Sequence, residues 1–531
     1  MRRFGTHSPK TRPAALWLAA SLALALSCSH RDATERAVDA ASPAAASATG
    51  KDLDSALAAH WRAAGVTPVA SADDLTLLRR VTLDLLGRVP STTELDAFVA
   101  DRPSDRYERG VDRMLGSAEH AEHLASTWAD VLVGGAIKVQ PRIVEGTRDF
   151  LTKQLVTDVG FDRIATQLLT AQGEIADDAG GGFLAAHGRR GRTAALAGET
   201  ARIFLAAQIQ CAQCHDHPST PFRQDEFYAF TAHFARTAVR PGKKGGELKI
   251  IDRARGQQRL PTPQDPPDDP SGELIAPAYF GAPTQVGDGT RREALAELIT
   301  QDRRFALAIA NRTWAAMFGR GIVEPVDDIG LGAPIPPLLD AVADLLVAHD
   351  FAIDPLLRDV ALSQAYRTDS RASDDPARVA AFAQASVRPL QIEPLVRSLA
   401  TAGATDSGPL VRAIEKRRGP MRALKFAFDD DEGASEDAGP SLQEALLWLR
   451  GDLTAMVAQD APGRALREVL RTQKTAEARI DALWWRFYGR RPDAQERALA
   501  VAHVADDPRG AAGYEDLVHA IVTSSEFTSN H

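Results

Sequence analysis

The chain has 531 residues, of which 44% are hydrophobic and 25% are charged, so its composition is that of a globular protein with more than one hydrophobic core. Its formal net charge of -9 leaves no excess of basic residues and argues against nucleic acid as the main partner. Aromatic residues make up only 6%, and alanine-rich runs carry much of the apolar content. Because alanine is the best helix former, this composition predicts a mainly α-helical fold.

The N-terminal segment has the pattern of a bacterial export signal. An apolar run over residues 13–26, too short to span a membrane, follows four basic residues, Arg2, Arg3, Lys10 and Arg12. The run ends in a segment that resembles a lipoprotein cleavage box, Ala25-Leu26-Ser27-Cys28. Cys28 would then become the lipidated first residue of an exported, periplasmic or outer-membrane lipoprotein. The alternative is an ordinary signal peptide cut nearby, with Cys28 incidental.

Beyond Cys28 the pattern changes from a tether to helices. Residues 29–50 are rich in Ala and Ser and predict a disordered tether. An amphipathic helical pattern begins at Asp52, and Gly87 is placed to end one of its helices with a left-handed cap. Ser91 and Glu94 predict a capping box at the start of the next helix.

The chain divides into two helical domains in this interpretation. The first spans residues 51–238 and contains a close cysteine pair. A Pro/Gly-rich connection follows over residues 239–289, with a minor β element at 248–251. The second helical domain spans residues 290–531, and a helix within it ends at Gly319. The predicted fold class is therefore mainly α, with two helical domains and minor β structure.

A similar sequence pattern occurs near both ends of the chain. Gly87-Arg88-Val89-Pro90-Ser91-x-x-Glu94 matches Gly489-Arg490-Arg491-Pro492-Asp493-x-x-Glu496. Downstream of each lies a second match, in which Ser117-x-Glu119 corresponds to Ser524-x-Glu526. The pattern predicts one helix-turn-helix module used twice. Independent convergence on the same helix-capping residues is the alternative.

One short motif carries chemistry: Cys211-Ala212-Gln213-Cys214-His215 has the spacing of c-type haem attachment. Two thiols three residues apart can each add to a vinyl group of the porphyrin, and the adjacent His215 can coordinate the iron. Residues 200–210 have a helical pattern, so we expect the motif at the end of a helix. Export fits this chemistry, because such attachment takes place outside the cytoplasm.

Other interpretations of the same residues stay open. Zinc or iron could be held by a non-haem site built from the two cysteines with His215 or His217. Cys211 and Cys214 could instead form a disulfide, although the chain has only three cysteines and no disulfide framework. For the haem itself, His217 lies two residues beyond His215 and points elsewhere on the local backbone, so His233 is the better candidate for the distal ligand of the iron.

The sequence also resembles a known pair of domains. Residues 52–236 resemble the secreted cytochrome-like domain of unknown function that is abundant in planctomycetes, through residues 78–87, 107–117, 128–130 and 204–228. Residues 290–531 resemble the domain that usually follows it, through residues 311–314, 318–328, 363–366 and 525–531. The resemblance implies export and a shared two-domain architecture. It implies no known reaction, because the cytochrome label rests on the same Cys-x-x-Cys-His motif.

We therefore expect an exported, membrane-tethered protein with one c-type haem, active in electron transfer or an oxidoreductase step with a redox partner protein. The alternatives are a surface-anchored binding or scaffold protein with a structural Cys/His metal site, and a hydrolase of extracellular polymers. The sequence contains no nucleophile elbow, P-loop, dinucleotide fingerprint or zinc-protease helix. Whether the chain is an enzyme stays open at this point.

The lipoprotein interpretation predicts that Cys28→Ser releases the protein from membranes into the soluble exported fraction, because the serine cannot receive the lipid. Fractionation of cells that produce the two forms measures this. Unchanged membrane association of the Cys28→Ser protein would contradict the lipid anchor.

Overall fold

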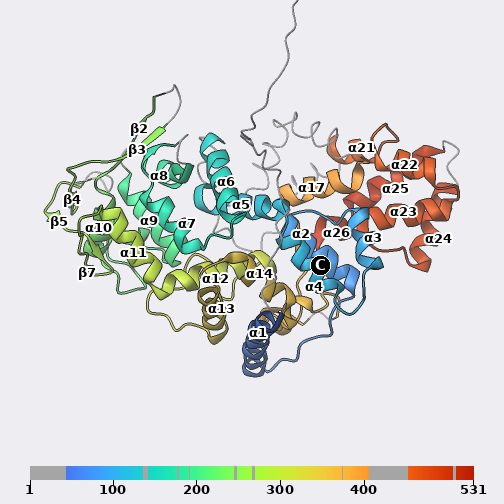
Figure 1. The fold of residues 1–531 in the computed structure, drawn as a ribbon, viewed down its shortest axis with the longest axis horizontal. Coiled ribbons are helices and arrows are strands. Elements are labelled where there is room, and N and C mark those ends of the chain that lie inside the picture. The colour runs from blue at the N-terminus through green and yellow to red at the C-terminus, as the bar shows by residue number, and fades with distance from the viewer. Residues whose placement is uncertain are drawn as a thin grey trace, which may run out of the picture. The chain divides into compact units, whose positions relative to one another are not determined.

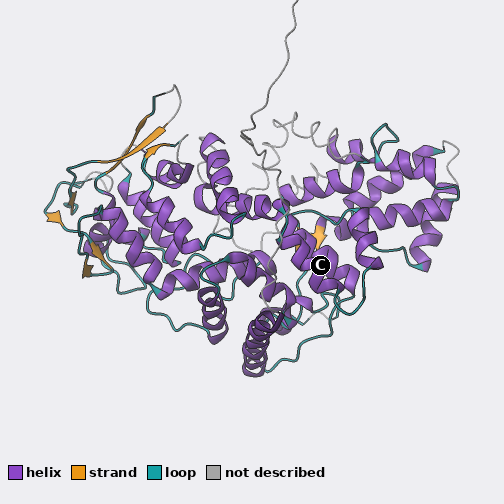
Figure 2. Ribbon diagram, viewed as in Figure 1, coloured by secondary structure: helices purple, strands orange, loops and turns teal. Residues whose placement is uncertain are grey.

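In the computed structural model, the described residues are 43–134, 141–175, 179–189, 192–243, 248–265, 270–372, 375–405, 452–505 and 510–531. Helices dominate them, and the strands are short (Figures 1 and 2), which confirms the mainly α-helical fold with minor β structure. Among these residues, no helix combines the length and hydrophobicity needed to cross a bilayer. The predicted signal segment with Cys28 lies outside the described residues.

The N-terminal series of elements is helical. It comprises α1 (Pro43–Ala64), α2 (Asp74–Leu86), α3 (Thr92–Ala100), α4 (Arg106–Leu115), α5 (Ala118–Val133), α6 (Pro141–Leu155), α7 (Phe161–Thr170), β1 (Gly173–Glu174), η2 (Ala179–Gly181), α8 (Gly182–His187), α9 (Thr193–Leu205), η4 (Gln210–Gln213), α10 (Gln224–Thr231) and η5 (Ala232–Phe234). Helix α1 begins at Pro43, inside the segment predicted as a tether. The alanines that follow this proline favour a helix over an open chain.

The middle of the chain holds most of the β structure. Its strands are β2 (Thr237–Pro241), β3 (Leu248–Asp252), β4 (Gln258–Arg259), β5 (Leu274–Ile275), β6 (Ala278–Tyr279) and β7 (Ala282–Pro283). Strand β3 lies between β1 and β2 in an antiparallel sheet, with Val239 opposite Ile250. The β element predicted at 248–251 is therefore confirmed.

The C-terminal series is again helical. It comprises α11 (Arg291–Gln301), α12 (Arg303–Phe318), α13 (Pro337–Ala348), α14 (Ile353–Leu362), α15 (Gln364–Arg367), α16 (Pro376–Ala380), β8 (Arg388–Pro389), α17 (Ile392–Gly403), α21 (Asp452–Ala458), α22 (Ala465–Thr472), α23 (Ala476–Tyr488), α24 (Ala494–Ala505), α25 (Ala511–Thr523), α26 (Ser525–Thr528) and β9 (Ser529–Asn530). Strand β8 pairs with β9.

The predicted helix ends are confirmed where local chemistry determines them. Gly87 ends α2 and Gly319 ends α12, both with left-handed backbone at φ 65° and 79°. Ser91 and Glu94 form the predicted capping box at the start of α3. These ends need only a glycine that tolerates positive φ, or a side chain that accepts from free N–H groups.

The repeated sequence pattern corresponds to a repeated ion-pair geometry. The guanidinium of Arg88 contacts the carboxylates of Glu94 and Glu119 at 2.7–2.9 Å. In the second copy, Arg490 contacts the carboxylates of Glu496 and Glu526 at 2.6–2.7 Å. The hydrogen bonds from Arg490 keep the pKa of Glu496 below its ordinary value. Each arginine therefore ties the turn that follows its helix to a helix farther along the chain, as expected for one module used twice.

Two hydrophobic cores organise the described residues. The first contains buried side chains from Leu53 to Ala383. The second contains residues between Leu395 and Phe527, together with Leu83 and Val89. The first core is continuous across the predicted connection at 239–289, since the rings of Phe204 and Phe305 have their centroids 6.5 Å apart. Both cores therefore draw on helices of the N-terminal series.

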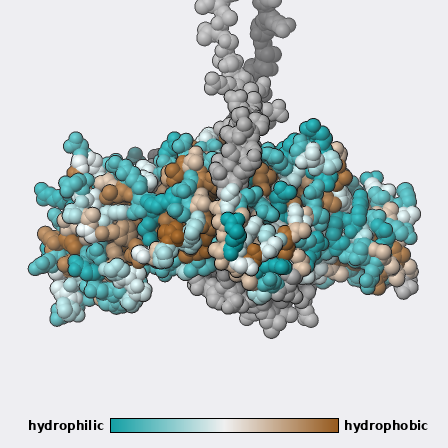
Figure 3. Space-filling view, turned by 90° about the horizontal axis from the view of Figure 1, so that it is seen from below, coloured by the Kyte–Doolittle hydropathy of each residue, from teal (hydrophilic) through white to brown (hydrophobic). Residues whose placement is uncertain are grey.

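The exposed surface carries its hydrophobic side chains separately. Leu499 is 65% exposed on α24 and Val99 is 49% exposed on α3. On the face shown in Figure 3, hydrophobic residues lie between larger areas of hydrophilic ones. Such scattered exposure is ordinary for a protein surface and needs no partner to explain it.

A buried carboxylate connects helix α2 to three distant segments. Asp84, whose side chain is 6% exposed, accepts hydrogen bonds from Arg388 at 2.7 Å, Tyr366 at 2.6 Å and Asn530 at 2.8 Å. Burial raises the pKa of Asp84, against the opposing effect of Arg388. Arg80, one turn earlier, donates to the main-chain oxygens of Tyr366, Thr368 and His531. We call Arg80, Asp84, Tyr366, Arg388 and Asn530 the Asp84 network.

The first core is continuous, so the two fragments produced by limited proteolysis should stay together. Residues 255–275 are rich in proline and polar groups, and the sequence predicts preferred cleavage there. We expect a fragment that holds Cys211 and a fragment that holds Trp314, and these should stay associated because they share one core. Size-exclusion chromatography of the cleaved protein, with and without denaturant, measures this association. Separate elution of the fragments in native buffer would contradict the shared core.

The Asp84 network should dominate the stability of α2. Asp84→Ala leaves Arg388 beside a buried site without its carboxylate, so the free energy of unfolding should fall by about 3–5 kcal/mol. The control is Glu108→Gln, because Glu108 is 53% exposed in its pair with Arg358 and should change stability by less than about 1 kcal/mol. Denaturant unfolding of the two variants checks this. An equal loss of stability in the two variants would contradict the stabilising role of the buried Asp84 carboxylate.

Candidate functional site

The Cys-x-x-Cys-His motif follows helix α9, but the helix ends earlier than its sequence pattern indicates. We expected a helix over residues 200–210, whereas α9 ends at Leu205 and Ala206 adopts φ 43°. Arg304 donates to the main-chain oxygens of Leu205 and Ala206 at 3.1 and 2.8 Å, and the N–H of Ile329 also donates to Ala206. These bonds from the C-terminal series satisfy the carbonyl groups at the end of α9, so the chain can leave the helix.

The motif itself occupies a short 3-10 turn and the loop after it. Cys211 lies in η4 and Cys214 directly follows it; both thiols are exposed and unpaired. Helix α10 holds the loop in place, because the Gln213 carbonyl accepts from Tyr228 Oη at 3.0 Å and from Gln224 Nε2 at 3.2 Å. Asp216 adds a bond, since its Oδ1 accepts from the N–H of Gln224 at 2.9 Å. The loop is therefore exposed but anchored.

The two histidines of the loop differ in which ring nitrogen is available. His215 Nδ1 lies 2.7 Å from the carbonyl oxygen of Asp216, which can only accept, so this nitrogen carries the proton. In the neutral ring, Nε2 of His215 then has the free lone pair that a metal needs. His217 has the opposite arrangement, because its Nδ1 accepts from the N–H of Ser219 at 3.3 Å. Neutral His217 therefore has its proton on Nε2, which suits a ligand poorly.

His233, the second predicted ligand, is already satisfied by other groups. It is 1% exposed in η5, with Nδ1 2.8 Å from the Phe230 carbonyl oxygen and Nε2 2.9 Å from Thr284 Oγ1. Burial lowers the pKa of His233 to about 4, so the ring is neutral at pH 7. Both ring nitrogens of His233 are thus engaged by Phe230 and Thr284.

The described residues bring no metal cage together. Among the ranges that the structure describes, no three His, Cys, Asp or Glu side chains are grouped so that they could hold a metal ion. Cys211, Cys214, His215 and His217 all fall within these ranges. The donors that remain at the motif are two free thiols and one imidazole nitrogen, which is the set that covalent haem attachment uses.

Sequence reasoning did not find the Asp84 network as a site. Its members come from α2, α15, β8 and β9, and a sequence read alone does not show which of these meet. One signal was available: Arg80 and Asp84 are four residues apart and share a face of a helix that is otherwise largely apolar. A charged pair on a buried helix face needs partners from elsewhere in the fold.

An open cleft lies beside the network. Its volume is about 600 Å³, and it is lined by Arg320, Ser370, Asp375, Pro376, Val379, Ala380, Gln384, Ala385, Ser386 and Val387. Val387 is 57% exposed there. The cleft is large enough for a small molecule, and its lining comes from residues outside the cysteine motif.

Family models match two separate stretches of the chain. Residues 52–239 match PSCyt2, described as a protein of unknown function (DUF1549). Residues 291–437 match PSD1, also described as a protein of unknown function (DUF1553). No curated protein and no solved structure matches the chain. The chain is thus a PSCyt2–PSD1 protein, with the first domain followed by the second in the order that its sequence motifs predict.

Proposed function

We propose that this PSCyt2–PSD1 protein carries one haem c, attached through thioether bonds at Cys211 and Cys214, with His215 as an axial ligand of the iron. The observation that carries the proposal is the state of the His215 ring. Its Nδ1–H donates to the Asp216 carbonyl oxygen, so Nε2 is left with its lone pair on the same loop that carries two free thiols.

Each residue of the motif has a separate role in this proposal. The thiols of Cys211 and Cys214 form the covalent bonds, and their exposure makes them accessible to an attachment system. The Asp216 carbonyl orients the His215 ring and makes its Nε2 a better donor. Haem bound here would supply an iron centre that accepts and returns one electron.

The position of the loop favours electron transfer. Cys211, Cys214, His215 and Asp216 are all exposed, so a group held by them would lie where a redox partner protein can approach. The bonds from Tyr228 and Gln224 to Gln213 keep the loop in one conformation. A rigid, accessible site of this kind suits an electron carrier, or an oxidoreductase that receives electrons from a partner.

The proposed location follows from the N-terminal sequence. Haem c is attached outside the cytoplasm, and the basic and apolar residues before Cys28 have the pattern of an export signal. We place the protein in the periplasm or at the outer membrane, held by a lipid on Cys28. The location and the cofactor then support each other, since each requires export.

The proposal predicts one haem per chain that survives denaturation when the protein is made in a host with an exported haem-ligation system. Thioether bonds persist in the unfolded chain, whereas a coordinated group is lost. Cys211→Ala with Cys214→Ala should remove the attached haem completely. His215→Ala should change the spectrum of the iron or block attachment. Intact-mass measurement and visible spectra of the denatured protein detect these changes.

The matched control is His217→Ala. His217 lies two residues after His215, and its substitution should leave both the haem mass and the spectrum unchanged. A mass equal to the bare processed polypeptide, with one zinc per chain, would contradict the haem and favour a metal site. A mass lower than that of the bare processed polypeptide by two hydrogen atoms, without any metal, would favour a Cys211–Cys214 disulfide instead.

A further inference from the structure

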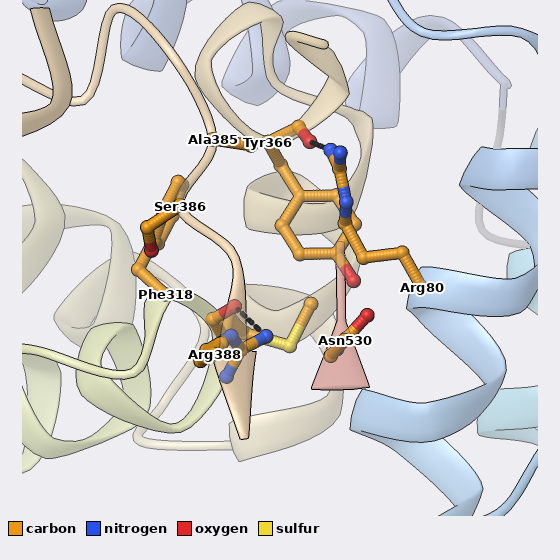
Figure 4. A pocket seen from close by; sticks show the side chains of 8 residues that line it. Arg80, Phe318, Tyr366, Ala385, Ser386, Arg388 and Asn530 are labelled. Atoms are coloured by element: carbon orange, nitrogen blue, oxygen red, sulfur yellow. Dashed lines mark hydrogen bonds between the residues drawn. The ribbon is translucent and has the colours of Figure 1, made fainter. Parts of the chain in front are cut away.

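A small cavity lies inside the Asp84 network, separate from the cysteine motif. Its free volume is about 10 Å³, and it is lined by Arg80, Met317, Phe318, Tyr366, Ala385, Ser386, Arg388 and Asn530. Figure 4 shows these side chains around the cavity, with Arg80 and Asn530 on α2 and β9 and Ser386 on the opposite segment. The walls therefore come from segments that are distant in the sequence.

Two of the polar atoms in this lining have no hydrogen-bond partner. Arg80 is 3% exposed and Asn530 is 4% exposed. Arg80 Nη2 is a buried donor without an acceptor, and Asn530 Oδ1 is a buried acceptor without a donor. Their other polar atoms are engaged, because Arg80 Nη1 donates to Tyr366 and Thr368, and Asn530 Nδ2 donates to Asp84. Leaving such buried groups unpaired is unfavourable, because they lose their hydrogen bonds to water without a replacement.

We propose that this cavity binds one water molecule, which donates to Asn530 Oδ1 and accepts from Arg80 Nη2. A volume of about 10 Å³ is just sufficient for a single water. The unpaired atoms are one donor and one acceptor, and water supplies both functions. An anion would meet the amide oxygen of Asn530, and a cation would meet the guanidinium groups of Arg80 and Arg388.

The water has a short route to solvent. Ala385 and Ser386 line both the cavity and the open cleft of about 600 Å³, so this two-residue segment separates the two spaces. The bound water therefore completes the hydrogen bonding of a network that joins the PSCyt2 domain to the PSD1 domain and to the segment after it, and it can enter from the cleft.

A substitution at Ala385, which lines both the cavity and the cleft, tests whether the water is bound, because it should lower stability if the water is present and raise it if the cavity is empty. Ala385→Val adds volume at the cavity, so it should expel the water, leave Arg80 Nη2 and Asn530 Oδ1 unpaired, and lower the midpoint of denaturant unfolding. Ala380→Val, which lines only the cleft, is the control and should leave the midpoint unchanged. A rise in the midpoint of Ala385→Val alone would overturn the proposal, because it would mean that an empty cavity had been filled.

A crystal structure of the unaltered protein, with a second crystal soaked in bromide, decides the matter without any variant. We expect one density peak within hydrogen-bond distance of both Asn530 Oδ1 and Arg80 Nη2, with no anomalous signal after the soak. An empty cavity would overturn the proposal. A bromide peak in the cavity would overturn it as well, because it would show an anion site.

Discussion

The fold depends on the need to neutralise one buried carboxylate. Asp84 sits on a helix that both hydrophobic cores use, since Leu78 and Leu85 belong to the first and Leu83 to the second. A charge at that position is tolerable only when several donors surround it. Tyr366, Arg388 and Asn530 provide them from three separate segments. The hydrophobic packing brings these segments near α2, and the carboxylate then fixes their positions.

The sequence predicted the parts of this fold that local chemistry controls. Gly87 and Gly319 end their helices because only a glycine adopts positive φ easily, and Ser91 with Glu94 caps the next helix. The early end of α9 was not predictable in this way. It depends on Arg304, which is 98 residues beyond Ala206 and donates to its carbonyl oxygen. The partners of Asp84 are hidden from local patterns for the same reason.

In the candidate site, too, some features follow from the sequence alone and others depend on the folded structure. The spacing of Cys211, Cys214 and His215 is a property of the sequence and indicates haem attachment without any structure. The sequence does not show whether His215 or His217 is the better ligand, because this depends on which ring nitrogen carries the proton. That depends on where the Asp216 carbonyl oxygen and the Ser219 N–H lie. His233 shows the opposite case, in which a promising residue type turns out to be fully bonded within the core.

The long separation between the partners of the Asp84 network has a consequence for synthesis. Asn530 lies 446 residues after Asp84, and the acceptors of Arg79 at Glu526 and Phe527 lie 447 and 448 residues after it. A chain emerging from a ribosome presents Arg79, Arg80 and Asp84 long before their partners have been made. Burying those charges early is unfavourable, so α2 cannot complete its packing until the distant residues arrive. Helix α2 therefore reaches its final packing only after the last residues of the chain have been made.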